Sequence, residues 1–129
     1  GGILEKYPNL KIAFAHGGGS FPFTIGRIDH GYNMRPDLCA IDNAKLPSSY
    51  MKHFYIDSLV HNKNAMYFLL DTVGAEQIAL GSDYPFPLGE QQPGKLIEEM
   101  DLTDSTKQRL LAGTALEWLG LTESEYIRN

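Results

Sequence analysis

The fold is decided first by the stretch Lys11-Ile12-Ala13-Phe14-Ala15, an apolar run without alternation that leads into His16-Gly17-Gly18-Gly19. Such a run predicts a strand buried on both faces, as parallel sheets require. The glycines predict a loop that tolerates positive φ angles and the close approach of a ligand. A helix follows, with Ser20 as a candidate cap and an end near Arg35-Pro36.

The same order of strand, loop and helix occurs twice more along the chain. Residues 53–57 predict a second strand, and a helix follows with an apolar stripe from Ala65 to Val73, closed by Gly74. Residues 77–80 predict a third strand, with a helix near residues 94–97. Three such units predict an α/β fold with a parallel sheet. They suit the last three strand–helix units of a (β/α)8 barrel; a small three-layer α/β domain is the alternative.

The chain is expected to form only part of a barrel. We expect residues 1–129 to be a single C-terminal part of a larger barrel domain, which usually needs about 250 residues. Residues 3–7 read as the last turn of a helix, and residues 110–119 keep a helical stripe that Gly113 weakens. Thr122 and Glu125 fit a capping box for a short final helix. Open sheet edges favour self-association.

Composition and charge narrow the functional classes. Apolar residues make up 43% and charged residues 21% of the 129 residues, a mixture that excludes a disordered chain. The formal net charge of -5 disfavours nucleic-acid binding. The sequence also lacks an apolar run of the ~20 residues that a membrane span needs. A single cysteine, Cys39, allows no internal disulfide and favours a reducing, cytoplasmic location.

Polar side chains follow all three predicted strands. His16, Asp57 and Asp83 stand at the strand ends, where parallel α/β folds bind their ligands. The His16 imidazole can exchange protons near neutral pH, or it can merely bond a loop carbonyl. The Asp83 carboxylate can bind a divalent ion or act as a base, or it can cap a turn. We expect the three residues to share one rim.

Other residues allow two interpretations each. Asp57 is either a rim residue or a cap for the next turn, and His61 is as plausible a loop hydrogen bonder as a functional group. Arg27 can bind a substrate carboxylate, or it can simply be a solvated charge on the surface of its helix. Tyr84 and Phe86, in a loop stiffened by two prolines, suit stacking on a flat substrate or an interface. The histidines show no metal-binding spacing, so this chain alone is not expected to complete a metal site.

Longer motifs carry a resemblance to a known family. They are Phe14 to Phe23 with Gly26-Arg27, then Met34 to Cys39, Phe54 to His61, Leu80 to Glu90, and Pro93 to Ile97. Together they resemble the aminocarboxymuconate-semialdehyde decarboxylase family, within the amidohydrolase superfamily of metal-dependent (β/α)8 barrels. The similarity runs through nearly the whole chain and corresponds to the C-terminal part of these enzymes.

The resemblance implies a reaction and a role for each site residue. The family removes CO2 non-oxidatively from a small dicarboxylate, a muconate semialdehyde of tryptophan catabolism (the kynurenine pathway), with the help of Zn²⁺. His16 resembles the histidine that activates water and relays protons, and Asp83 resembles the aspartate metal ligand. Arg27 resembles the arginine that reaches into the neighbouring subunit of a homodimer and grips a substrate carboxylate. Phe86 resembles the aromatic wall beside the substrate.

The remaining ligands of the family lie outside this sequence. The family takes a His-x-His from its first strand and a histidine from its fifth, and the chain contains neither motif. We therefore expect the isolated 129-residue chain to bind metal weakly and to be inactive. Two other hypotheses stay open: a related hydrolase or hydratase that shares His16 and Asp83, and a non-catalytic dimerisation module in which the Arg27 helix is a subunit contact.

Overall fold

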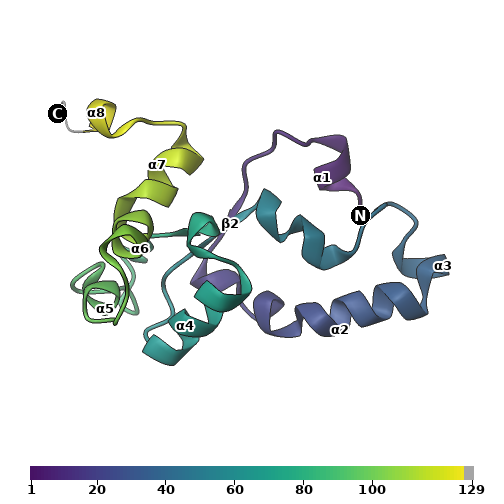
Figure 1. The fold of residues 1–129 in the computed structure, drawn as a ribbon, viewed down its shortest axis with the longest axis horizontal. Helices are drawn as coiled ribbons and strands as arrows, with labels where there is room; N and C mark the ends of the chain where they lie inside the picture. Colours follow the sequence, from purple (N-terminus) through teal and green to yellow (C-terminus); the bar gives the residue numbers. More distant parts are fainter. Residues whose placement is uncertain (127–129) are drawn as a thin grey trace.

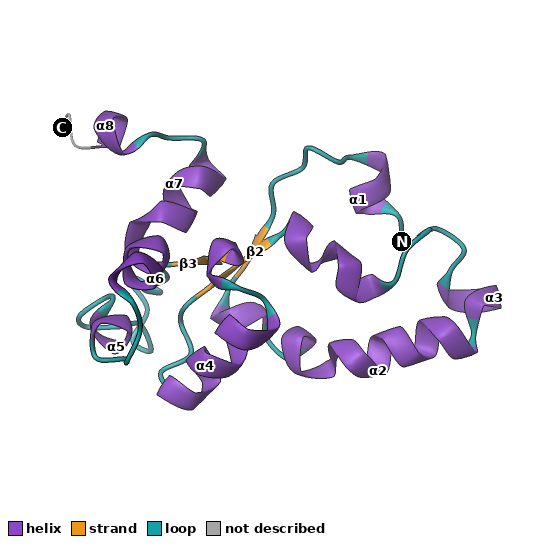
Figure 2. Cartoon of the chain, viewed as in Figure 1, coloured by secondary structure: helices purple, strands orange, loops and turns teal. Residues whose placement is uncertain are grey.

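A three-stranded parallel sheet lies at the centre of the computed structural model, which describes residues 1–126. The strands are β1 (Ala13–Phe14), β2 (Tyr55–Asp57) and β3 (Ile78–Ala79), in that spatial order. Phe14 pairs with Ile56, and Ile56 pairs with Ile78. The predicted parallel α/β arrangement is confirmed, although each strand is shorter than expected. Figure 2 shows how small the sheet is beside the helices.

Helices surround the short sheet. In Figure 1, helices α1 to α3 lie on one side of β2, helices α5 to α8 lie on the other, and α4 is between them. Short 3₁₀ turns complete the connections at His16–Gly18, Pro47–His53 and Ala75–Gln77. The α-helices of residues 1–126 are α1 (Ile3–Lys6), α2 (Phe21–Met34), α3 (Pro36–Cys39), α4 (Lys63–Thr72), α5 (Lys95–Glu98), α6 (Asp104–Gln108), α7 (Thr114–Leu119) and α8 (Glu123–Tyr126). Within residues 1–126, none of the helices has both the length and the apolar composition that crossing a membrane requires.

The core lies between β2, β3 and the helices that follow them. The predicted stripe of α4 is confirmed in its centre, since Met66 and Leu69 are buried. One polar side chain is fully buried here, and its hydroxyl is satisfied: Thr114 Oγ1 donates to the carbonyl of Ala75 at 2.8 Å. The largest side chains with almost no exposure are Ile56, Met66, Ile78, Ile97, Leu110 and Thr114.

Three local expectations were wrong. Strand β1 is exposed at Ala13 and Phe14 rather than buried on both faces, because it pairs only with β2 and forms an edge of this sheet. The expected strand start at His53 lies instead in a 3₁₀ turn. Ser20 precedes α2, but its side chain makes no capping bond. Its carbonyl accepts from Thr24 instead.

The C-terminal helical region contains a π-helical segment. Arg109–Gly113 joins α6 to α7 with helical backbone on both sides, so the predicted helical stripe of residues 110–119 begins in a π turn and continues into α7. One half of the capping box forms: the N–H of Thr122 donates to Glu125 Oε2 at 2.7 Å, whereas the N–H of Glu125 donates to the Thr122 carbonyl rather than to its hydroxyl. Hydrogen bonds from the Thr122 hydroxyl and from its N–H hold the pKa of the Glu125 carboxyl below its usual value.

The amino end of β2 is tied to α7 by a polar cluster. Glu117 accepts hydrogen bonds from Arg109 and from the hydroxyl of Tyr55, the first residue of β2. The Arg109 guanidinium holds the pKa of the Glu117 carboxyl below its usual value, and burial raises the pKa of Tyr55. Lys11, just before β1, donates to the Glu117 carbonyl at 2.9 Å. This cluster fastens the end of the sheet that lies away from Asp57.

Close packing leaves no room for a side chain at two of the three consecutive glycines after β1. A Cβ on Gly17 would lie 2.7 Å from Val60 Cγ1 and 2.8 Å from Leu69 Cδ1, and one on Gly18 would lie 2.9 Å from Ile56 Cγ2. A Cβ on Gly19 would meet no atom within 4 Å. The expectation that these glycines leave room for a ligand therefore fails at Gly17 and Gly18, where core side chains fill the space.

Gly17→Ala and Gly120→Ala form a matched pair, because both glycines have left-handed backbone, with φ 62° and ψ 22° at Gly17 and φ 71° and ψ 28° at Gly120. A Cβ on Gly120 would meet only Lys11 Nζ, at 3.8 Å. Left-handed backbone costs an alanine about 1–2 kcal/mol at either site. Gly17→Ala should lower the free energy of unfolding by a further 1–3 kcal/mol or so, because the methyl group overpacks the core. Urea unfolding of the two variants measures the difference. Equal losses would show that packing does not select glycine at this turn.

Candidate active site

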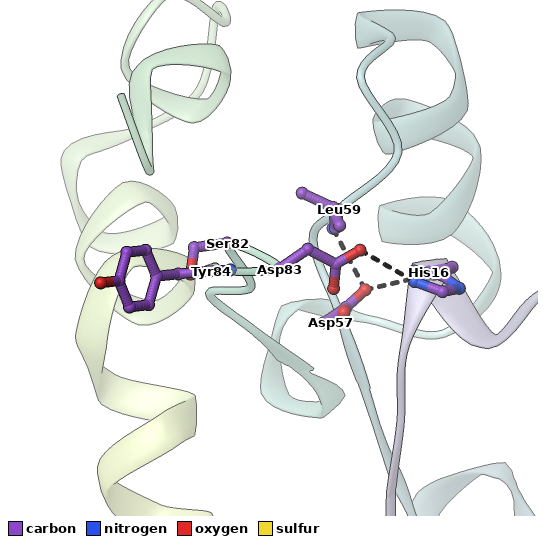
Figure 3. Close-up of polar contacts among 7 residues, drawn as sticks. His16, Asp57, Leu59, Ser82, Asp83 and Tyr84 are labelled. Atoms are coloured by element: carbon purple, nitrogen blue, oxygen red, sulfur yellow. Dashed lines mark hydrogen bonds and ion pairs between the residues drawn. The ribbon is translucent and has the colours of Figure 1, made fainter. Parts of the chain in front are cut away.

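His16 and Asp83 meet at the carboxyl edge of the sheet. His16 follows β1, Asp83 follows β3, and the Nε2 of His16 lies 3.0 Å from Oδ2 of Asp83. Figure 3 shows the two side chains pointing toward each other from opposite sides of the end of β2. The pair faces solvent, since the His16 side chain is 66% exposed and that of Asp83 is 23% exposed. An imidazole beside a carboxylate on an open edge can exchange protons and bind cations.

Both residues have an unusual backbone. His16 has a φ of 59° and Asp83 a φ of 52°, in the left-handed region that most side chains avoid. Such residues cost on the order of 1–3 kcal/mol each and persist only where their surroundings hold them. His61, in the loop after β2, is the other non-glycine residue with a positive φ within residues 1–126. Sequence reasoning missed this strain, although aspartate and histidine are among the non-glycine residues that adopt this conformation most often.

Asp57 and Ser58 connect the two turns that carry the pair. Oδ1 of Asp57 accepts from the N–H of Gly17 at 2.9 Å and from the N–H of Leu59 at 3.1 Å. The hydroxyl of Ser58 accepts from the N–H of Gly81 at 3.2 Å. Asp57 is thus both a rim residue and the cap of its own turn. The sequence offered no signal for Ser58, because a serine after a strand is common in any loop.

The loop after Asp83 folds back on itself. The Asp83 carbonyl accepts from the N–H of Phe86 at 2.7 Å, and the Ser82 carbonyl accepts from the N–H of Glu90 at 2.9 Å. This close path needs Gly89, where a Cβ would lie 2.5 Å from the Ser82 oxygen. Phe86 is 68% exposed and Tyr84 is 88% exposed, and Figure 3 shows Tyr84 pointing away from the pair. Both rings are available to a ligand or to another part of the protein.

Arg27 is not brought to the pair within this chain. It is exposed on α2, whereas Arg35 and Arg109 each bind a carboxylate. Within residues 1–126, Arg27 makes no ion pair. Its guanidinium is free to bind a carboxylate from elsewhere.

The donors at this edge fit part of a metal site. Asp83 offers a carboxylate oxygen and His16 an imidazole, both of which are common ligands of divalent ions. Among residues 1–126, no three His, Cys, Asp or Glu side chains lie close enough together to hold a metal ion. A tightly bound ion would need ligands in addition to those described here.

Comparison with known proteins points to one family. A family model described as "Amidohydrolase" matches residues 1–121. The chain is 55% identical over 128 residues to the 2-amino-3-carboxymuconate-6-semialdehyde decarboxylase of Dictyostelium discoideum, covering 98% of this chain and 36% of the relative. It is 44% identical over 125 residues to the enzyme of the same name in Caenorhabditis elegans, covering 96% and 31%. The chain therefore spans about a third of the length of these relatives.

Solved structures share the fold. The crystal structure of 5-carboxyvanillate decarboxylase from Novosphingobium aromaticivorans, complexed with manganese and 4-hydroxy-3-methoxy-5-nitrobenzoic acid, matches with a TM-score of 0.80. The two chains are 24% identical, and the match covers 93% of this chain and 36% of that one. At 24% identity, this likeness shows that the two proteins share the arrangement of short parallel strands and surrounding helices.

The His16–Asp83 pair should contribute little to folding, because a solvent-facing ion pair is usually worth about 0–1 kcal/mol. A double-mutant cycle of His16→Gln and Asp83→Asn, followed by urea unfolding without added metal, measures the coupling. We expect a coupling below about 1 kcal/mol. A coupling of about 3 kcal/mol, the size found for buried pairs, would identify a structural salt bridge instead.

Proposed function

This chain belongs to the amidohydrolase family, and we propose that it supplies the last three strand–helix units of a metal-dependent (β/α)8 barrel. Strands β1 and β3 are the outer strands of the sheet that residues 1–126 form, so each has an edge to offer to a further strand. Phe14 on β1 is 49% exposed and Phe23 on α2 is 81% exposed. Apolar side chains of this size favour burial against the rest of a longer protein.

The proposed activity of the whole protein is the decarboxylation of 2-amino-3-carboxymuconate-6-semialdehyde. The observation that carries this proposal is the 55% identity to a decarboxylase of that substrate over nearly the whole chain. The geometry supports it independently, because His16 and Asp83 stand together at the carboxyl edge of a parallel sheet. From the same relationship we propose that the protein acts in tryptophan catabolism and in the cytoplasm.

Asp83 is the proposed metal ligand of this chain. Its carboxylate would hold a divalent ion, which we propose to be Zn²⁺, and the other ligands would come from parts of the protein beyond the described residues. When bound, such an ion supplies concentrated positive charge and makes a water molecule more acidic.

His16 is the proposed proton carrier. Its Nε2 lies 3.0 Å from Asp83 Oδ2, so the imidazole is next to the proposed metal ligand. The two residues follow different strands, β1 and β3. An imidazole so placed can accept a proton from water and return one to the carbon that loses CO2. The 66% exposure of its side chain leaves the ring accessible from the side on which a substrate would lie.

Arg27 and Phe86 are the proposed substrate-binding residues. The exposed guanidinium of Arg27, on the long helix α2, suits a carboxylate of the substrate in the neighbouring subunit of a homodimer. Phe86 follows Asp83 by three residues, and its exposed ring offers a flat face for a conjugated substrate. Together they would offer a small conjugated dicarboxylate one cationic and one aromatic partner.

Asp83→Asn and His16→Gln should affect the whole enzyme differently. Asp83→Asn removes a ligand, so we expect loss of bound metal together with a fall in kcat of at least about 100-fold. His16→Gln should keep the metal and lower kcat by about 100-fold or more, as for a lost acid–base group. Metal content and the loss of ultraviolet absorbance of the substrate measure both effects. Asp71→Asn, on the exposed face of α4, is the control; full activity with either site variant would contradict these roles.

Arg27→Ala should raise KM for the dicarboxylate by about 10–100-fold, because a charge-assisted hydrogen bond is worth about 1.5–3 kcal/mol. Arg35→Ala, at the end of the same helix but paired with Asp37, should leave KM unchanged. Trapping of CO2 in the same assay separates decarboxylation from a hydrolase or hydratase reaction. A weaker dimer with unchanged KM would instead support the dimerisation module, in which Arg27 is only a subunit contact.

A further inference from the structure

We propose that Asp57 and Ser58, two consecutive residues at the end of the central strand, are positioning residues that fix His16 and Asp83 relative to each other. This inference rests on the proposed function, since it concerns the same pair. Neither residue is needed to contact substrate. Each acts through the turn that carries one member of the pair, Asp57 on the His16 turn and Ser58 on the Asp83 turn.

Asp57 fixes the turn of His16. Its Oδ1 accepts a hydrogen bond from the N–H of Gly17, the residue directly after His16, and another from the N–H of Leu59, two residues after Asp57 itself. Their lengths of 2.9 and 3.1 Å are those of ordinary N–H···O hydrogen bonds, so one carboxylate oxygen satisfies both backbone donors. His16 has a φ of 59°, so its backbone needs such a restraint to stay in the left-handed region. The carboxylate thus sets the direction in which the imidazole leaves the chain.

Ser58 fixes the turn of Asp83. Ser58 is only 3% exposed, and its N–H donates to the Ala79 carbonyl at 2.9 Å, which extends the ladder between β2 and β3. Its hydroxyl accepts the N–H of Gly81, two residues before Asp83. A buried acceptor that satisfies a backbone donor allows little movement, because breaking the bond leaves a polar group unpaired.

Direct packing joins the two turns at Gly81. A Cβ on Gly81 would lie 2.8 Å from Asp57 Cβ and 2.9 Å from Asp57 Oδ2, so the backbone of the Asp83 turn passes against the Asp57 side chain. Figure 3 shows the Asp57 carboxylate just below that of Asp83, with His16 to one side. Asp57 therefore touches both turns, by hydrogen bonds on one side and by van der Waals contact on the other.

The variants Asp57→Asn, Asp57→Ala and Ser58→Ala separate hydrogen bonding from charge. Asparagine keeps an oxygen that can accept from Gly17 and Leu59, so we expect kcat within about threefold of the wild type. Asp57→Ala removes the acceptor and should lower kcat by about 10–100-fold, with KM and metal content nearly unchanged. Ser58→Ala should lower kcat by about 10-fold. Asp71→Ala, an exposed residue of α4, is the control and should behave as the wild type.

Hydrogen exchange provides a readout that does not depend on catalysis. In the whole protein, peptides that cover residues 15–20 should exchange about 10-fold faster in Asp57→Ala than in the wild type, because the Gly17 N–H loses its acceptor. The same peptides should exchange at the wild-type rate in Asp57→Asn. Peptides from α7 serve as an internal control, since α7 packs on the far side of the sheet (Figure 1).

The outcomes separate this inference from the proposed function. Unchanged exchange at residues 15–20 in Asp57→Ala would overturn the positioning role, whatever the enzyme does. Equal losses of kcat in Asp57→Asn and Asp57→Ala would also overturn it, since charge rather than hydrogen bonding would then be responsible. A wild-type protein that releases no CO2, yet shows the expected exchange pattern, would refute the proposed function and leave the positioning of His16 supported.

Discussion

The hydrogen bond from the Gly17 N–H to the Asp57 carboxylate is the contact on which the arrangement of the site depends. It joins the end of β2 to the turn after β1, and so determines where the imidazole of His16 can lie. Ser58 makes the corresponding contact to the turn after β3. A sheet of very short strands has few ladder bonds to fix its neighbours, and these side-chain contacts add the restraint that the ladder lacks.

The two ends of β2 have different physical roles. At the amino end, Tyr55, Glu117 and Arg109 form a cluster in which hydrogen bonds and charge stabilise the docking of α7. At the carboxyl end, His16 and Asp83 have left-handed backbones, which cost free energy rather than provide it. Departures from local backbone preference of this kind are expected mainly at functional sites. The contrast supports assigning chemistry to one end and stability to the other.

The sequence predicted the parallel units and the polar strand ends, because apolar runs bounded by glycine, histidine or aspartate have few alternatives in an α/β chain. It also led to the meeting of His16 and Asp83 at one rim. It did not predict the exposure of β1, since burial of a strand depends on which strands flank it in space. Nor did it predict the positive φ of Asp83 or the role of Ser58, because both depend on contacts between residues far apart in the chain.

Anomalous diffraction from crystals of the whole protein grown with manganese tests the central assignment most directly. The proposed site predicts one strong peak at coordination distance from the Asp83 carboxylate, with the His16 ring beside it and the Gly17 N–H still directed at Asp57. A peak at ligands remote from Asp83, or a structure in which His16 and Asp83 lie apart, would contradict the assignment of this edge of the sheet as the active site.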